Sequence, residues 1–266
     1  MRHISFLGFQ PQDARLVLNL LAINIRDRYL GSMLGLVWAV LNPVLFLGMY
    51  TFVFAFIFRS KPSGADTTLA YVIWLITGLV PYQAVAEGFS VSANSVVAGA
   101  SLVKNLVFKT ETLPLAAVLT AAVPLSVGLV FVLALLVADG NYPSWHVVWL
   151  LPTLGAQFLC LAGFGLLLAA TTVFFRDLLQ ALTTVTTLIL FLTPIFYPLE
   201  QLPGPLQKLT FYNPFYQMIV PYRDALVFHR SPDWQGLLYL LVFGALTFVV
   251  GLWYFRRLKG YFETAL

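Results

Sequence analysis

The sequence predicts an all-α polytopic membrane protein with six transmembrane helices, an N-terminal amphipathic interface helix and outer re-entrant helices. Of its 266 residues, 60% are hydrophobic and 10% are charged, whereas a soluble domain carries charge at roughly a quarter of its positions. The charges leave six uncharged stretches, each long enough to cross a hydrocarbon core about 30 Å thick. This composition excludes a soluble globular enzyme. Because no internal repeat is visible, the chain is one predicted domain, 1–266.

The six predicted spans follow these uncharged stretches, at about 30–58, 69–97, 113–138, 147–175, 178–199 and 235–256, and the second of them extends past Glu87. An even number of spans puts both termini on one side of the membrane. Of the 15 Lys and Arg residues, five lie in segments on the opposite side, namely Arg59, Lys61, Lys208, Arg223 and Arg230. Because cytoplasmic segments carry the excess of basic residues, the others predict cytoplasmic termini.

The segment 13–29 precedes the first span and predicts a helix lying in the cytoplasmic interface. At about 100° per residue, Arg15 and Arg26 fall on one stripe, while Leu16 and Leu20 cluster on another face. A basic stripe of this kind faces lipid headgroups or a partner protein. The alternative is a frayed start to the first span.

The stretch 200–236 contains five prolines, yet it is rich in Phe, Tyr, Leu and Val. Neither of its apolar halves, 206–212 and 215–228, is long enough to span a bilayer. Amphipathic half-helices over 203–228 that dip into the outer leaflet would explain both the apolar content and the helix breaks at the prolines. Such re-entrant backbone requires that protein covers it or that it lines an aqueous cavity. The alternative is an outer loop lying on the membrane surface.

Two short segments between spans are expected on the cytoplasmic side. The first, 98–115, carries Lys104 and Lys109, and the second makes a tight turn at Arg176 and Asp177. Together with the basic N-terminal helix, they would form a compact docking surface for a partner. Alternatively, these basic residues only fix the topology, as in many cytoplasmic loops.

Glu87 is the one ionisable residue far from a predicted boundary. If the second helix continues through 88–97, this carboxylate lies in the inner third of the span and faces a partner or a wet cavity, since an acid in hydrocarbon is costly. If the helix instead ends near residue 86, Glu87 meets water. The sequence shows no basic intramembrane partner for it, which argues against a proton-coupled transporter.

Aromatic side chains concentrate near the outer ends of the first and fifth spans, among them Tyr50, Phe54, Phe191, Phe196 and Tyr197. Flat ring faces along a conduit could support sugar rings by stacking, without strong hydrogen bonds. An interfacial aromatic belt, or packing within the bundle, would give the same pattern.

The sequence holds no GxxxxGK[ST] phosphate loop, no HExxH motif and no GxSxG motif. Its three histidines have no carboxylate or cysteine partners at ligand spacing, and the single Cys160 lies in an apolar run. We expect no cofactor, metal ion or nucleic acid on this chain. Energy for any pumping must therefore come from an ion gradient or from another subunit.

Several segments, taken in order, resemble the membrane-spanning (permease) subunit of type-2 ABC exporters that move O-antigen, capsule or teichoic acid polysaccharides. They are 26-RDRYLGSMLGLVWAVLNP-43, 81-PYQAVAEGFSVSANSVVAGASLVKNLVF-108, 174-FFRDLLQ-180, 194-PIFYPLE-200 and 213-NPF-215. The resemblance covers nearly the whole chain, and its first run and the FFRD turn are specific to that group.

The resemblance implies a homodimer that encloses a canal for lipid-linked polysaccharide in the bacterial inner membrane. Each subunit would dock to a separate ATP-binding cassette subunit, which would hold ATP and Mg²⁺. A type-2 ABC permease for drugs or small lipids shares this architecture and is the alternative. The segment PYQAV at 81–85, where many relatives carry more aromatic residues, leaves the polysaccharide itself open.

The resemblance also implies roles for particular residues. The elements that contact the ATPase would contain Ser101, Leu102, Lys104, Asn105, Lys109, Phe175, Arg176 and Asp177. The interface helix would present Arg15, Arg26 and Arg28. The translocation pathway would be lined by Trp38, Tyr50, Phe54, Glu87, Phe191, Phe196 and Tyr197.

Overall fold

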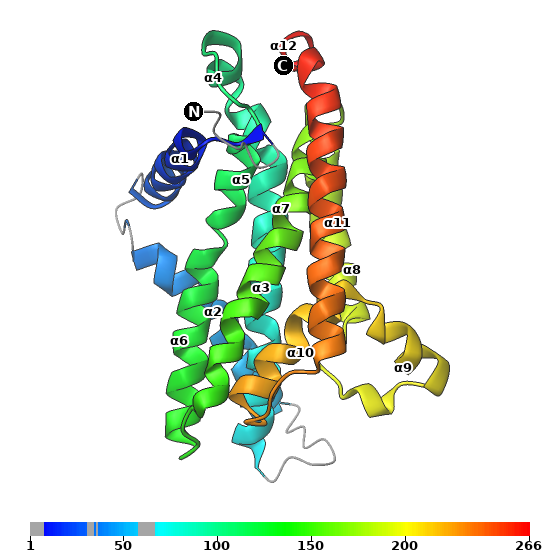
Figure 1. The fold of residues 1–266 in the computed structure, drawn as a ribbon. Coiled ribbons are helices and arrows are strands. Elements are labelled where there is room, and N and C mark those ends of the chain that lie inside the picture. The colour runs from blue at the N-terminus through cyan, green and yellow to red at the C-terminus, as the bar shows by residue number, and fades with distance from the viewer. Residues whose placement is uncertain (1–7, 31–34, 36, 58–66) are drawn as a thin grey trace.

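The computed structural model describes residues 8–30, 35, 37–57 and 67–266. Its regular elements are helices, and no strand occurs within these ranges. Figure 1 shows an elongated bundle, with α4 (Ala100–Asn105) and α12 (Phe262–Ala265) at one end and α10 (Pro214–Leu226) toward the other. We call these the α4 end and the α10 end.

Four helical stretches are long and apolar enough to cross a membrane: Thr68–Ala98, Thr112–Ala138, Trp145–Phe174 and Trp234–Ala265. The first is α3 (Thr68–Ala98), and the second joins α5 (Thr112–Leu119) to α6 (Ala122–Ala138). The third is a 3-10 turn, η3 (Trp145–Trp149), followed by α7 (Leu150–Phe174). The fourth is α11 (Trp234–Leu258), continued by η5 (Lys259–Tyr261) and α12. They overlap four of the six predicted spans.

Two shorter apolar helices overlap the remaining predicted spans. α2 (Val37–Phe52) continues into a π-helical turn, η2 (Val53–Ile57), while residues 31–34, 36 and 58 lie outside the described residues. α8 (Leu178–Leu192) ends well before the predicted boundary at 199. Thr193 adopts extended angles, φ −93° and ψ 132°, because the residue before a proline is disfavoured in the helical region.

Small residues let α7 and α11 pack backbone to backbone. A Cβ added at Gly163 would lie 2.4 Å from the carbonyl carbon of Thr247, and one at Gly251 would lie 2.4 Å from the carbonyl oxygen of Gly163. Close approach at small residues is typical of helices that pack within membranes, where no hydrophobic force drives their association. The α7–α11 pair therefore forms a tightly packed part of the bundle.

The predicted segment 203–228 contains two helices, α9 (Gly204–Phe211) and α10, after a short 3-10 turn, η4 (Leu199–Gln201). Asn213 caps α10 by accepting hydrogen bonds from the backbone N–H groups of Phe215 (3.0 Å) and Tyr216 (3.4 Å), which a helix start otherwise leaves unpaired. Most of α10 is buried, including Met218 and Tyr222. It packs against α3, α7 and α11.

The predicted interface segment 13–29 falls within α1 (Pro11–Leu30), which lies beside α5 near the α4 end (Figure 1). Leu20 is buried, and Leu16 and Val17 pack against the same apolar cluster. Leu18 and Ile23 are exposed. One side of α1 therefore contacts the bundle, while other apolar side chains remain on its surface.

Candidate functional site

The segment 98–115, which is predicted to contact the ATPase and which we call the coupling segment, presents an exposed surface at the α4 end. Ser101, Leu102, Lys104 and Asn105 are exposed on α4, whereas Val103 is buried in the apolar cluster that contains Phe262 of α12. The extended residues after α4 add Leu106 and Val107, which are also exposed. Exposed apolar side chains beside a lysine are typical of a surface that contacts a partner.

The predicted turn between α7 and α8 belongs to the same surface. Phe175, Arg176 and Asp177 are exposed there, and 69% of Phe175 is accessible. The neighbouring ring of Phe174 lies 6.1 Å from that of Phe262. Phe262 thus connects the two predicted coupling elements, which are more than 60 residues apart in the sequence. We call this the α4-end surface and define it by α4, residues 106–107 and residues 174–177.

Lys109 does not belong to this exposed set, because it pairs with α1. Its ammonium group forms an ion pair with Asp13 and donates to the backbone oxygen of Gly8 at 2.7 Å. Burial raises the pKa of Asp13, but the hydrogen bonds from Lys109 and the backbone of Gln10 outweigh it and leave the pKa below its ordinary value. Lys109 therefore connects the coupling segment to α1.

A second ion-pair cluster joins the same loop to α11. The carboxylate of Glu111 is buried, and its Oε1 atom accepts hydrogen bonds from Arg256 (3.1 Å) and Lys259 (3.0 Å). Burial raises the pKa of Glu111, but backbone and side-chain hydrogen bonds and the Lys259 charge lower it below its ordinary value. Glu111 therefore helps to fix the loop after α4 against the end of α11.

The three predicted arginines of α1 differ in their contacts. Arg15, Arg26 and Arg28 are all exposed, and Arg28 forms an ion pair with Glu87 of α3. Since α3 continues to Ala98, Glu87 lies within the helix, and the alternative that the helix ends near residue 86 is wrong. Glu87 does have a basic partner, Arg28, which comes from α1 rather than from another span.

Five of the predicted pathway residues form one aromatic cluster, which we define as Tyr50, Phe54, Phe191, Phe196 and Tyr197. The ring of Phe196 stacks on Tyr50 at 5.6 Å and on Phe54 at 5.4 Å, and it lies 5.5 Å from Phe191. The Tyr197 hydroxyl donates to the backbone oxygen of Phe191 at 3.0 Å. The turn after α8 thereby joins α2.

Trp38 and Glu87 are not part of the aromatic cluster. Along α2, Trp38 lies about 18 Å from Tyr50 at 1.5 Å per residue. The aromatic cluster touches α3 instead through Tyr71, whose ring lies 6.3 Å from Phe54 and whose hydroxyl donates to the Phe196 backbone at 3.0 Å. Glu87 lies about 24 Å farther along α3 than Tyr71.

Arg223 of α10, predicted only to lie in an outer segment, is a buried cation. Its guanidinium donates to the backbone oxygens of Trp74 (3.3 Å), Pro194 (2.9 Å) and Ile195 (2.9 Å). It also lies 3.7 Å from the centroid of the Trp74 ring, a cation–π contact. Arg223 therefore satisfies carbonyl groups that are left free where α8 ends.

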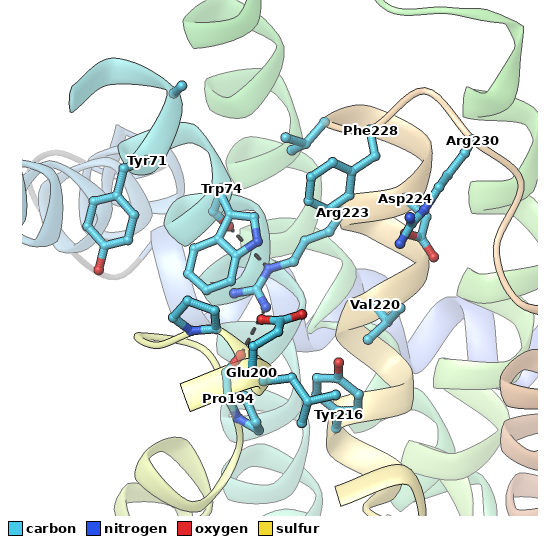
Figure 2. A pocket seen from close by; sticks show the side chains of 14 residues that line it. Tyr71, Trp74, Pro194, Glu200, Tyr216, Val220, Arg223, Asp224, Phe228 and Arg230 are labelled. Atoms are coloured by element: carbon cyan, nitrogen blue, oxygen red, sulfur yellow. Dashed lines mark hydrogen bonds and ion pairs between the residues drawn. The ribbon is translucent and has the colours of Figure 1, made fainter. Parts of the chain in front are cut away.

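Beside Arg223 lies a pocket of about 430 Å³, drawn in Figure 2, which we call the α10-end pocket. It is formed by the start of α3, the segment 194–200, α10 and the residues that follow it. Asp224 is buried and pairs with Arg230 at 2.7 Å. The only sequence signal for this site was a pair of adjacent opposite charges, 223 and 224, within an apolar segment.

Comparison with known proteins places this architecture in a family. Residues 15–227 match the model of the ABC-2 type transporter membrane domain. The chain belongs to the ABC-2 type transporter family. The match to this family begins in α1 and ends just after α10, so it includes the α4-end surface, the aromatic cluster and most of the α10-end pocket.

Curated members of the family match along nearly their whole length. An O-antigen export system permease protein RfbA from Klebsiella pneumoniae is 30% identical over 244 residues, which are 91% of this chain and 92% of the relative. One from Myxococcus xanthus is 28% identical, covering 90% and 88% of the two chains. The polysialic acid transport protein KpsM of Escherichia coli is 23% identical, covering 94% and 95%.

Proposed function

We propose that this ABC-2 chain is the permease subunit of an exporter that moves lipid-linked polysaccharide across the bacterial inner membrane. The observation that carries this proposal is that relatives named for O-antigen export and for polysialic acid transport both match more than 90% of the chain. These names favour polysaccharide over the drugs or small lipids of the alternative. The chain itself would catalyse no reaction.

The topology that we propose has six spans and cytoplasmic termini, with the α4 end in the cytoplasm. Four spans are the long helices, and the two others are α2 with η2, and α8 with the turn after it. α9 and α10 would be re-entrant helices from the outer side. The burial of α10 against α3, α7 and α11 supports this, because protein then covers its polar backbone.

Transport would be powered by a separate ATP-binding cassette subunit, which would hold ATP and Mg²⁺ and dock on the α4-end surface. The exposed Leu102, Phe175 and Arg176 on this surface support the assignment, since they combine apolar area with positive charge. Closure of the nucleotide-bound ATPase would then move α4 and the α7–α8 turn as rigid elements.

Two copies of the chain would enclose the pathway, with the aromatic cluster along its wall. Phe191 is 60% exposed although it lies on an apolar helix, which supports a position facing a partner copy or the pathway. Aromatic faces bind the C–H faces of sugar rings through dispersion and release them readily, because they make few hydrogen bonds.

Deletion of the gene tests the proposed function. Cells without it should lose surface polysaccharide and accumulate the lipid-linked polymer inside, while their resistance to drugs stays unchanged. The purified chain should co-purify with an ATP-binding cassette subunit. Surface polysaccharide at the parental level after deletion, or transport by the isolated chain down an ion gradient, would refute the proposal.

A further inference from the structure

The α10-end pocket contains donors that no group among the described residues uses. A guanidinium group has five N–H donors, and three hydrogen bonds occupy Arg223, all to backbone oxygens. Among the described residues no carboxylate forms an ion pair with Arg223, although only 5% of this residue is exposed. Two N–H groups of a buried cation therefore remain at the edge of a pocket.

The same pocket presents acceptors. Both contacts from Arg230 reach the Oδ1 atom of Asp224, so that within the described residues Oδ2 has no hydrogen bond. The exposed carboxylate of Glu200 also lines the pocket and is drawn among its side chains in Figure 2. The Tyr216 hydroxyl, which can both donate and accept, completes the polar lining.

An apolar face lies next to these polar groups. Phe228 lines the pocket with a ring that is 50% exposed, and Val220 and Val227 extend this face. The two arginines and the two carboxylates cancel in formal charge. The lining therefore suits a ligand that carries several hydroxyl groups next to an apolar face, and its balanced charges favour no net charge on the ligand.

We infer that the α10-end pocket binds an uncharged sugar unit, whose hydroxyls pair with Arg223, Asp224 and Glu200 while its C–H face lies on Phe228. The volume of about 430 Å³ lies within the range of small-molecule sites. An acidic or a cationic ligand would meet groups of both signs here, so neither gains from a net charge in the lining. Vicinal hydroxyls match the planar, two-pronged geometry of carboxylate and guanidinium groups.

The pocket adjoins the aromatic cluster through α3. Tyr71 lines the pocket, stacks on Trp74 at 5.9 Å and contacts Phe54 of the aromatic cluster. A polymer that followed the aromatic cluster toward the α10 end would therefore reach this pocket. The identity of the sugar as part of an exported polymer rests on the proposed function, whereas the pocket's affinity for a neutral sugar does not.

Saturation-transfer NMR on the purified permease–ATPase complex in lipid nanodiscs tests this inference. The probes are the methyl glycosides of glucose, galactose, mannose, rhamnose and N-acetylglucosamine, together with that of glucuronic acid. At least one neutral glycoside should bind, and Glu200→Gln should weaken it about tenfold, because a charged hydrogen-bond acceptor is replaced by a weaker neutral one. Phe228→Ala should weaken the same glycoside.

Two variants at the same end serve as matched controls. Asp139→Asn removes an exposed carboxylate and Tyr142→Ala removes an exposed ring, both outside the pocket. Both should bind the glycoside like the parent. Since Glu200 and Phe228 are exposed, their substitution leaves the fold intact. Binding of glucuronide alone, equal binding by Glu200→Gln and parent, or no binding of any glycoside would overturn the inference.

Failure here is distinguishable from failure of the proposed function. If deletion of the gene leaves surface polysaccharide unchanged, the proposed function fails whatever the NMR experiment shows. If deletion abolishes surface polysaccharide but no neutral glycoside binds in the α10-end pocket, only the pocket inference fails.

Discussion

Replacing Gly78 with alanine should displace the buried guanidinium of Arg223. A Cβ at Gly78 would lie 2.5 Å from Nη2 and 3.1 Å from Cζ of Arg223. An ordinary contact begins near 3.4 Å, so the guanidinium must move by about 1 Å. Its bonds to Pro194 and Ile195, both 2.9 Å, would then exceed the length of a hydrogen bond.

The expected cost follows from these bonds. Each hydrogen bond from a charged group contributes about 1.5–3 kcal/mol, and alanine in a helix interior recovers about 0.5–1 kcal/mol relative to glycine. Loss of two bonds therefore gives a net destabilisation of about 2–5.5 kcal/mol. Denaturant titration of the purified chain in mixed micelles, followed by tryptophan fluorescence, measures it.

A matched control and a double variant show whether Arg223 is the cause. Gly155 lies inside α7 with no atom within 4 Å of its added Cβ, so Gly155→Ala should be neutral or slightly stabilising. Arg223→Met removes the group with which the new methyl collides. The Gly78→Ala substitution should therefore cost little in the Arg223→Met background. Equal stability of the two alanine variants, or additive costs in the double variant, would refute this reasoning.

Three further predictions concern other parts of the molecule. Lys104→Glu should reduce co-purification of the ATPase subunit without changing membrane insertion. Lys208→Glu changes an exposed lysine near the opposite end and should leave co-purification unchanged. Equal yields of complex from the two variants would contradict this prediction. Phe54→Ala should reduce surface polysaccharide more than it reduces the amount of protein. Trp234→Ala removes an exposed ring outside the aromatic cluster and should reduce neither. Parallel losses of polymer and protein in Phe54→Ala would mean that the ring only packs the bundle. Because the pKa of Glu111 is lowered in the folded state, its contribution to stability is present above its unfolded pKa and is lost as the pH falls through the folded pKa. Glu111→Gln should therefore be less stable than the parent at pH 7, and the denaturant midpoints of variant and parent should converge as the pH is lowered. A difference between the two midpoints that does not change with pH would exclude this contribution of the Glu111 carboxylate.

The long spans were predictable because hydrocarbon imposes a uniform requirement. A stretch such as Thr112–Ala138 must be apolar throughout to cross it, and the positions of the charges therefore locate its ends. The same criterion fails for α8. No charge follows Leu192 until Glu200, but the backbone leaves the helix at Thr193 because Pro194 follows.

The polar contacts were not predictable from spacing. Arg28 and Glu87 are 59 residues apart, and Arg223 reaches Trp74 across 149 residues. The partners of Arg223 are backbone oxygens, which every residue has, so that no residue type in the sequence indicates them. From the sequence, Arg223 counts only among the basic residues of the outer segments, but an arginine can be buried when carbonyl groups left free by a helix end accept its donors.

α3 is the element that physically connects the α4-end surface with the α10-end pocket. Its 31 residues extend about 46 Å, from Tyr71 and Trp74 beside the pocket, past Glu87, to the start of α4. Pro81 is the one proline within it, and a proline weakens a helix by removing a hydrogen bond. The side chain of Gln157 donates to the Pro81 oxygen at 3.1 Å and accepts from the Tyr222 hydroxyl at 2.6 Å. α7 and α10 thus hold α3 at this proline. If the proposed ATPase displaces α4, we expect the displacement to be transmitted along α3 toward the pocket rather than absorbed at a hinge.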